Sequence, residues 1–310
     1  MIRDSRPVGF QLSIYQESLK AAELVSEKIT PDEVRRMLAL LSETSLVIIV
    51  IDEFDRVTDS EARRTMADTV KSLSDNLVGA TLVLVGVGES VDGLIGGHPS
   101  IDRALVQFKM PRMSRGEVHQ ILDNGVKQLG MKISDEAKNH IGVLSQGLPH
   151  YGHMLGLHAT RVALDCRDLS ISLAHVECAI RKAVEDVQQS IASAYTTAVA
   201  VHRKGNIYSD VLLACALAKT NTFGYFTATD VKDQLCAITG KEYDIPSFAR
   251  HLEDFCSDSR GRVITLKGDP RKKTYRFLNP LMQPHVIMHG LVNKRISREQ
   301  IERAALFAQH

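Results

Sequence analysis

The stretch LVIIVIDEFDRV, residues 46–57, decides the fold. Its first six residues are an unbroken run of large apolar side chains, five of them β-branched. A short run of this kind predicts a strand with both faces covered, as in a parallel sheet between layers of helices. The run ends in Asp52 and Glu53. The sequence therefore predicts two carboxylates at the carboxyl edge of the sheet, where open α/β folds bind their ligands.

The two carboxylates can take separate roles, because successive side chains of an extended strand point to opposite faces. One can hold a hydrated Mg²⁺, an ion that uses few protein oxygens together with water and phosphate. The other can polarise a water for attack on a γ-phosphate, since phosphoryl transfer depends on positioning and charge stabilisation. The alternative interpretation is a buried strand that happens to end in an acidic turn.

The surrounding segments alternate between helix and strand. Helices are expected over residues 13–29, 30–42 and 58–74, and a second buried strand, ATLVLVGVG, over residues 80–88. The second helix opens on Thr30, Pro31 and Glu33, which together form a capping box with proline in the first turn. This alternation is typical of an α/β layer architecture.

From Ser114 the pattern becomes helical. Ser114 and Glu117 form a capping box, Ser134 caps the next helix, and a long helix is expected over residues 173–201. The tripeptide Gly147-Leu148-Pro149 interrupts this region. Residues 112–200 are therefore expected to be all-α.

Residues 208–290 follow a third pattern. Helices are expected over residues 208–219, 229–239 and 245–256, followed by the strands RVITL and KTYRFL around a turn at residues 267–272. Three helices followed by a hairpin predict a winged helix. A last helix is capped by Ser297, with Gln300 three residues later.

Composition limits the function classes. The chain has 310 residues, which predicts about two domains, and a net charge of +1, which gives no global attraction to nucleic acid. Five cysteines without a CxxC pair are typical of reduced thiols in a cytoplasmic protein. The start MIRDSRPVGF has no apolar segment of a signal peptide, and no apolar run approaches the ~20 residues of a membrane span.

The segment IDEFDRV resembles the Walker B motif of AAA+ and STAND ATPases, closest to initiators of the origin-recognition and cell-division-control type. Other segments resemble further family motifs in the same order. TLVLVGVG resembles the sensor 1 strand, the segment around Arg103 resembles one with an arginine finger, and Gly147-Leu148-Pro149 resembles the GxP of STAND lids.

The resemblance covers about residues 35–285 and implies four parts. These are a partial α/β P-loop core over residues 1–111, a helical lid over 112–205, a winged helix over 206–290 and a C-terminal helix over 291–310. It implies ATP and Mg²⁺ as cofactors.

By resemblance, Asp52 would bind Mg²⁺ and Glu53 would activate water. Arg103 would act in a neighbouring subunit of a homo-oligomer, although a solvated surface arginine explains it equally well. The residues that contact the nucleotide would be Glu89, Ser90, Gly147, Pro149 and His150. His150 and His153 are one helical turn apart, but no further metal ligand accompanies them.

Two departures from the family pattern limit the expected activity. No GxxxxGK[ST] occurs in the sequence, so the phosphate-cradling loop, its lysine and its Mg²⁺-binding hydroxyl are missing. We expect that the chain begins inside the domain, or else belongs to a natural variant without ATP binding. Glu89 would also repel a γ-phosphate at the sensor position. The chain alone is therefore expected to bind ATP weakly and to be inactive as an ATPase.

The hairpin turn is the candidate contact with double-stranded DNA. Lys267, Arg271, Lys272 and Lys273 lie on it, and the expected recognition helix offers Ser247, Arg250 and His251 together with Glu253 and Asp254. Basic turns suit phosphate contacts, which position a protein without reading sequence. The alternative is a solvated turn in a module that packs on protein. Two hypotheses follow: an ATPase switch with a DNA-binding module, or a nucleotide-independent adaptor for protein or DNA.

Overall fold

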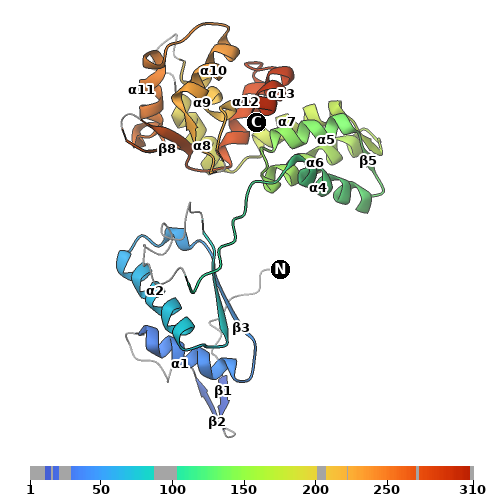
Figure 1. Ribbon diagram of the computed structural model, residues 1–310. Coiled ribbons are helices and arrows are strands. Elements are labelled where there is room, and N and C mark those ends of the chain that lie inside the picture. The colour runs from blue at the N-terminus through green and yellow to red at the C-terminus, as the bar shows by residue number, and fades with distance from the viewer. Residues whose placement is uncertain are drawn as a thin grey trace. The chain divides into compact units, whose positions relative to one another are not determined.

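The computed structural model describes residues 11–14, 17–20, 29–86, 103–200, 207–221, 223–269 and 272–307 (Figure 1). The chain divides into two compact units, Met1–Lys109 and Met110–His310. Each unit is described by itself below. In the described part of the chain, no helix is long and apolar enough to cross a membrane.

The first unit begins with a β-hairpin. Strand β1 (Gln11–Ile14) pairs antiparallel with β2 (Glu17–Lys20), with Leu12 opposite Leu19. The helix predicted over residues 13–29 is therefore wrong at residues 13–14 and 17–20. Polar and apolar residues alternate along QLSI, and this period of two fits a strand better than a helix.

The described α/β part of this unit contains two helices and two parallel strands. Helix α1 (Pro31–Ser42) and strand β3 (Val47–Ile51) are followed by a 3₁₀ turn (Phe54–Arg56), helix α2 (Ser60–Asp75) and strand β4 (Ala80–Leu84). Strands β3 and β4 are in register from Val47 opposite Ala80 to Ile51 opposite Leu84. The capping box at Thr30 and Glu33 is confirmed, whereas α2 is capped by the carboxylate of Asp59.

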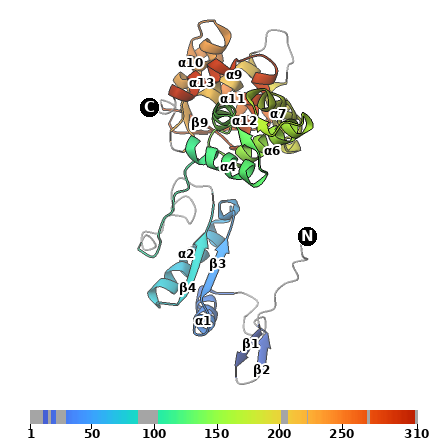
Figure 2. The ribbon, with the colours of Figure 1, turned by 90° about the vertical axis from the view of Figure 1, so that its right-hand side faces the viewer.

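The prediction that the first apolar strand is covered on both faces is wrong for the described residues. Ile51, Leu82 and Leu84 pack against a small core that contains Phe54 and Val70. The alternate side chains face away from this core, and Ile48 and Val50 are 58% and 61% exposed. Helices α1 and α2 contact each other, and α1 also packs on both strands (Figure 2). The described residues thus form one covered face and one uncovered face.

The second unit begins with five helices. They are α4 (Arg115–Gln128), α5 (Asp135–Leu144), α6 (Pro149–Asp165), α7 (Leu173–Glu185) and α8 (Gln189–Val199). The predicted caps at Ser114 and Ser134 are confirmed. Two short parallel strands, β5 (Lys132–Ile133) and β6 (Ser170–Ile171), are an addition to the all-α prediction.

The long helix predicted over residues 173–201 is two helices. Helix α7 ends at Glu185, and Gln188 adopts an extended conformation before α8 begins. Helix α7 packs on α5, α6 and α12, while α8 packs on α9 and also on α12. The break after α7 brings α8 against α9, a helix on which α7 does not pack extensively.

The rest of the unit combines helices with a small antiparallel sheet. Its elements are α9 (Tyr208–Leu217), β7 (Phe226–Thr227), α10 (Ala228–Thr239), α11 (Ile245–Phe255), a 3₁₀ turn (Asp258–Arg260), β8 (Ile264–Lys267), β9 (Thr274–Phe277), α12 (Met282–Val292) and α13 (Arg298–Phe307). The predicted hairpin is the β8–β9 pair, and β7 adds a third strand on the other side of β9.

One hydrophobic core runs through the whole second unit. Leu144 and Leu155 of the first helices, Leu213 and Phe248 of the later ones, and Ile301 of α13 belong to the same buried cluster. The expected division into a lid, a winged helix and a terminal helix at residues 205 and 290 therefore stays a prediction. The described parts of those three segments fold around a common interior.

Candidate functional site

Asp52 and Glu53 lie directly beyond the carboxyl end of β3. The strand ladder continues past β3, because Val85 donates its N–H to the Ile51 carbonyl and Phe54 donates to the Val85 carbonyl, both at 2.9 Å. Phe54 is buried in the core of the first unit, while both acidic residues are exposed. The chain thus turns sharply after Ile51 and leaves two carboxylates at the sheet edge.

The turn is made by Glu53 in a left-handed conformation, with φ 56° and ψ 33°. Residues other than glycine rarely adopt this conformation, which costs on the order of 1 kcal/mol and persists where the surrounding structure holds it. Asp52 stabilises the turn, since its Oδ1 accepts the N–H of Glu53 at 2.7 Å. The Glu53 carboxylate lies 3.1 Å from the guanidinium of Arg56.

This geometry suits a hydrated cation at the edge of the strand. One oxygen of Asp52 is used within the turn, and the described contacts leave its other oxygen available. Mg²⁺ needs only one or two protein carboxylates when water and phosphate complete its shell. A fully protein-made metal site is a different case, and the described residues contain no cluster of three or more His, Cys, Asp or Glu that could form one.

The other residues of the predicted nucleotide site are distributed between the two units. Glu89 and Ser90 lie outside the described residues. Arg103 belongs to the first unit and is exposed. Gly147, Pro149 and His150 belong to the second unit. That these residues contact a bound nucleotide stays a prediction.

The turn at Gly147 has a clear structural role that sequence reasoning missed. Met113 donates its N–H to the Gly147 carbonyl at 2.9 Å. The guanidinium of Arg112 donates to the Gln146 carbonyl at 3.0 Å and to the Gln283 side chain of α12 at 2.9 Å. The α5–α6 turn therefore fixes residues 112–113, where the chain enters the second unit.

Pro149 and the neighbouring histidines occupy the start of α6. Pro149 is its first residue, a position that tolerates proline because no N–H is needed there. His150 and His153 are exposed, while Tyr151 is buried and donates its hydroxyl to the Leu281 carbonyl at 2.7 Å. His158 lies elsewhere, 3.6 Å from the Asp186 carboxylate. His150, His153 and His158 do not form a common metal site in this arrangement.

Gly147→Ala is expected to destabilise the protein by roughly 2–4 kcal/mol. Gly147 has a φ of 71°, and a Cβ there would lie 2.6 Å from the Met113 carbonyl oxygen and 2.8 Å from Arg112 Cβ. The substitution thus adds backbone strain and a clash with the entering chain. Chemical denaturation would measure the loss in the free energy of unfolding.

Gly130→Ala is the matched control for this substitution. Gly130 has a φ of 67°, and nothing lies within 4 Å of a Cβ placed there. It should therefore lose only about 1 kcal/mol, the cost of the left-handed conformation. Equal losses for the two variants would contradict the anchoring role of Gly147.

The predicted DNA-binding residues are only partly available as free cations. Lys273 lies 2.8 Å from the Glu253 carboxylate of α11, and this hydrogen bond raises the pKa of Lys273. Arg250 is highly exposed, with its Nε 4.0 Å from Asp254. The ammonium of Lys267 lies 5.7 Å from the ring centre of Tyr225. Lys272 is exposed, and Arg271 lies outside the described residues.

His251 of the expected recognition helix is half-buried and packs on the ring of Tyr208. Their ring centres are 4.4 Å apart, and burial lowers the pKa of His251. The Tyr208 hydroxyl donates to Asp254, and the guanidinium of Arg260 lies 3.8 Å from the centre of the Tyr208 ring. His251 is thus partly covered by Tyr208, and its availability for a DNA contact stays a prediction. The exposed side of α11 carries Ser247, Arg250 and Glu253.

Part of the chain matches a known protein family. Residues 10–114 match the family model described as bacterial TniB protein. No curated protein shows a significant match to the chain.

The chain is also similar to several solved structures, at low sequence identity. The Aeropyrum pernix ORC2 protein is 15% identical, covering 89% of this chain and 70% of that one, with a TM-score of 0.42. The Thermotoga maritima RuvB Holliday junction branch migration motor is 13% identical, covering 81% and 74%, with a TM-score of 0.42. Cdc6p from Pyrobaculum aerophilum is 14% identical, covering 89% and 75%, with a TM-score of 0.38.

The family match falls on residues 10–114, most of which belong to the first unit. TniB is a P-loop ATPase family, and the matched segment includes β3, Asp52, Glu53 and β4. About a third of the chain, residues 10–114, thus matches the bacterial TniB family of P-loop ATPases, which confirms the resemblance drawn from IDEFDRV.

Proposed function

We propose that the first unit forms the carboxylate side of an Mg²⁺–ATP site in an ATPase switch protein. Asp52 holds the hydrated Mg²⁺, and Glu53 orients and polarises the attacking water. The observation that carries this proposal is the strained turn after β3. It leaves two exposed carboxylates at the end of a parallel strand, where α/β folds bind ligands.

The residues present fit the cation better than the phosphates. Asp52 supplies an anionic oxygen of the kind that Mg²⁺ prefers. When bound, Mg²⁺ neutralises phosphate charge during phosphoryl transfer. The sequence contains no glycine-rich loop with lysine and a hydroxyl residue, which would hold the phosphates themselves. We therefore propose that a longer polypeptide supplies this loop and that the 310 residues alone bind ATP weakly.

The test is the Mg²⁺ dependence of nucleotide binding by a polypeptide that carries the loop. Binding of a fluorescent ATP analogue is expected to tighten when Mg²⁺ is added, and Asp52→Asn should remove most of that tightening. The exposed Asp68→Asn on α2 is the matched control and should leave it intact. Equal Mg²⁺ dependence in all three proteins would show that Asp52 does not hold the ion.

We further propose that residues 206–290 form a winged helix that contacts double-stranded DNA through its β8–β9 turn. The order α9, α10, α11 and hairpin supports this interpretation, as do the exposed cations on the turn. Lys273 is paired with Glu253, and the proposed contact also includes Lys267, Lys272, Arg250 and Arg271. Such phosphate contacts position a protein without selecting a sequence.

A nucleotide-independent adaptor is the second candidate function. The observation that favours it is the uncovered apolar face of β3 and β4, together with Val106 and Phe108, which are 79% and 85% exposed. Apolar side chains in such number commonly mark protein contacts. Arg103 is exposed in the same unit and would belong to an oligomer contact in either case. Mg²⁺-independent function of the whole protein would favour the adaptor.

A further inference from the structure

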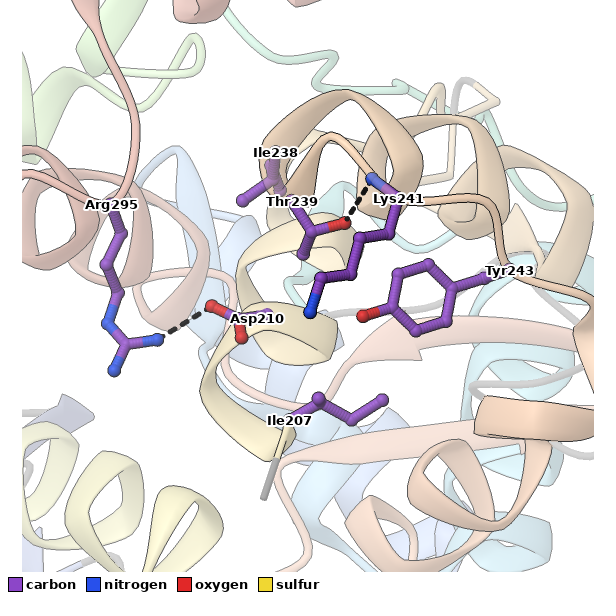
Figure 3. A pocket seen from close by; sticks show the side chains of 7 residues that line it. All are labelled: Ile207, Asp210, Ile238, Thr239, Lys241, Tyr243 and Arg295. Atoms are coloured by element: carbon purple, nitrogen blue, oxygen red, sulfur yellow. Dashed lines mark hydrogen bonds and ion pairs between the residues drawn. The ribbon is translucent and has the colours of Figure 1, made fainter. Parts of the chain in front are cut away.

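A cavity of about 370 Å³ lies beside the start of α11 in the second unit (Figure 3). Four segments line it: the first turn of α9, the end of α10, the α10–α11 turn and the α12–α13 connection. The lining residues are Ile207, Asp210, Ile238, Thr239, Lys241, Tyr243 and Arg295. None of them belongs to the hairpin turn or to the carboxylate pair described above.

Hydrogen-bond donors converge on this cavity. Figure 3 shows the Lys241 ammonium and the Tyr243 hydroxyl pointing toward the same space, with the Arg295 guanidinium on the far side of Asp210. Arg295 donates to Asp210 Oδ1 at 2.7 Å. This bond orients the guanidinium and uses only one of its five N–H groups. Lys241 has no ion pair within the described part of the chain.

A second cavity of about 380 Å³ shares Arg295 with the first one. Lys294, Ser297 and Gln300 also line it. Lys294 is exposed and forms no ion pair with any described residue. Among the described residues, the two cavities together hold three cations, Lys241, Lys294 and Arg295, and one carboxylate, Asp210. Their combined lining is therefore positive, although the whole chain is nearly neutral.

We propose that these two adjoining cavities bind backbone phosphates of double-stranded DNA, as a contact separate from the hairpin turn. A phosphodiester is a monoanion that takes hydrogen bonds from lysine, arginine and hydroxyl groups, and this donor set lines the cavities. Lys241 and Tyr243 lie in the turn that leads into α11. A duplex that meets the exposed side of α11 at Ser247 and Arg250 would thus have the cavities beside it. The proposal rests on the proposed DNA contact of this module.

The test is the salt dependence of binding between the full chain and a labelled 30-base-pair duplex, followed by fluorescence anisotropy. A Lys241→Gln/Lys294→Asn variant removes two cations, and asparagine suits the left-handed backbone of Lys294. Counterion release predicts a loss of about 0.9 in the slope of log affinity against log salt for each phosphate contact. We therefore expect a slope lower by about two and binding at least roughly 10-fold weaker at 0.1 M salt.

Two further variants separate this proposal from the hairpin contact. The exposed Lys219→Gln, at the end of α9, is the matched control and should leave both slope and affinity unchanged. Lys272→Gln tests the hairpin. Weakening by Lys272→Gln with wild-type binding by the cavity variant would overturn the cavity site and leave the hairpin contact standing. Absence of duplex binding by the wild-type chain would overturn both.

Polyglutamate and inorganic phosphate test whether the cavities bind an anion other than DNA. Polyglutamate is added at the same concentration of negative charges as the duplex. If it displaces the duplex, and if its binding also depends on Lys241 and Lys294, the cavities bind acidic protein and the proposal is wrong. If the cavity variant loses affinity for inorganic phosphate but not for the duplex, the cavities hold free anions and the proposal is again wrong. Circular dichroism melts of each variant would establish that the fold is retained.

Discussion

The Glu53→Gln variant is expected to hydrolyse ATP at least about 100-fold more slowly than the wild type while binding Mg²⁺–ATP with similar affinity. Glutamine keeps the size and hydrogen-bonding shape of the side chain but cannot accept a proton from water. The loss should therefore fall on turnover and not on binding. The measurement is steady-state ATPase activity in a polypeptide that carries the phosphate-binding loop, with nucleotide affinity determined separately.

A second acidic residue serves as the control for Glu53. Glu61 is an exposed carboxylate in the first turn of α2, and Glu61→Gln should retain wild-type turnover. The Glu53→Gln substitution also removes the surface ion pair with Arg56, which contributes less than about 1 kcal/mol to stability. Turnover equal to wild type in Glu53→Gln would refute the assignment of water activation to this residue.

Stability is expected to fall steeply as the pH drops from 6.5 toward 4. Burial lowers the pKa of His140 and of His285 to about 4, with smaller contributions from Arg298 and His289 respectively. Both imidazoles are 2% exposed. In this pH window the unfolded chain takes up protons that the folded chain does not, so each histidine removes up to about 3 kcal/mol of stability.

Chemical denaturation at pH 7 and pH 5 would measure this dependence. The range above pH 5 avoids most of the titration of carboxylates. A His140→Leu/His285→Leu variant should show a flatter pH dependence, whatever its stability at pH 7, because it lacks two of the buried histidines whose pKa is lowered. If the wild type and this variant lose the same free energy between pH 7 and pH 5, the buried histidines are not the cause.

The sequence predicts local structure well where side chains act on their own backbone. The capping boxes at Thr30 and Ser114 and the cap at Ser297 lie where the side-chain spacing places them. The parallel strands and the hairpin were also predictable from apolar runs and turn residues. These features depend on contacts within a few residues, which a sequence pattern records directly.

Features that depend on distant contacts were not predictable from the sequence. The break between α7 and α8 accompanies the packing of α8 on α9, a contact outside both helices. The packing of His251 depends on Tyr208 and Arg260, which come from other elements. The anchoring of Arg112 joins residues more than 170 positions apart along the chain. A rule based on residue spacing cannot predict contacts between residues so far apart in the sequence.

The candidate site also has features that the sequence predicts and features that it does not. Asp52 and Glu53 could be found because the acidic pair follows its strand directly. The left-handed turn at Glu53 could not, because nothing in the sequence IDEF demands it. The cavity at Lys241 and Arg295 had no sequence signal either, since its residues come from four separate segments.

The most direct test of the central claim is the position of Mn²⁺, substituted for Mg²⁺, in crystals of the loop-bearing polypeptide with an ATP analogue. Anomalous scattering locates this ion, which shares the preference of Mg²⁺ for oxygen ligands. The account predicts an anomalous peak about 2–2.5 Å from a carboxylate oxygen of Asp52, or one water molecule away from it, beside the nucleotide phosphates. A nucleotide-bound Mn²⁺ with neither Asp52 nor its water shell in contact would contradict it.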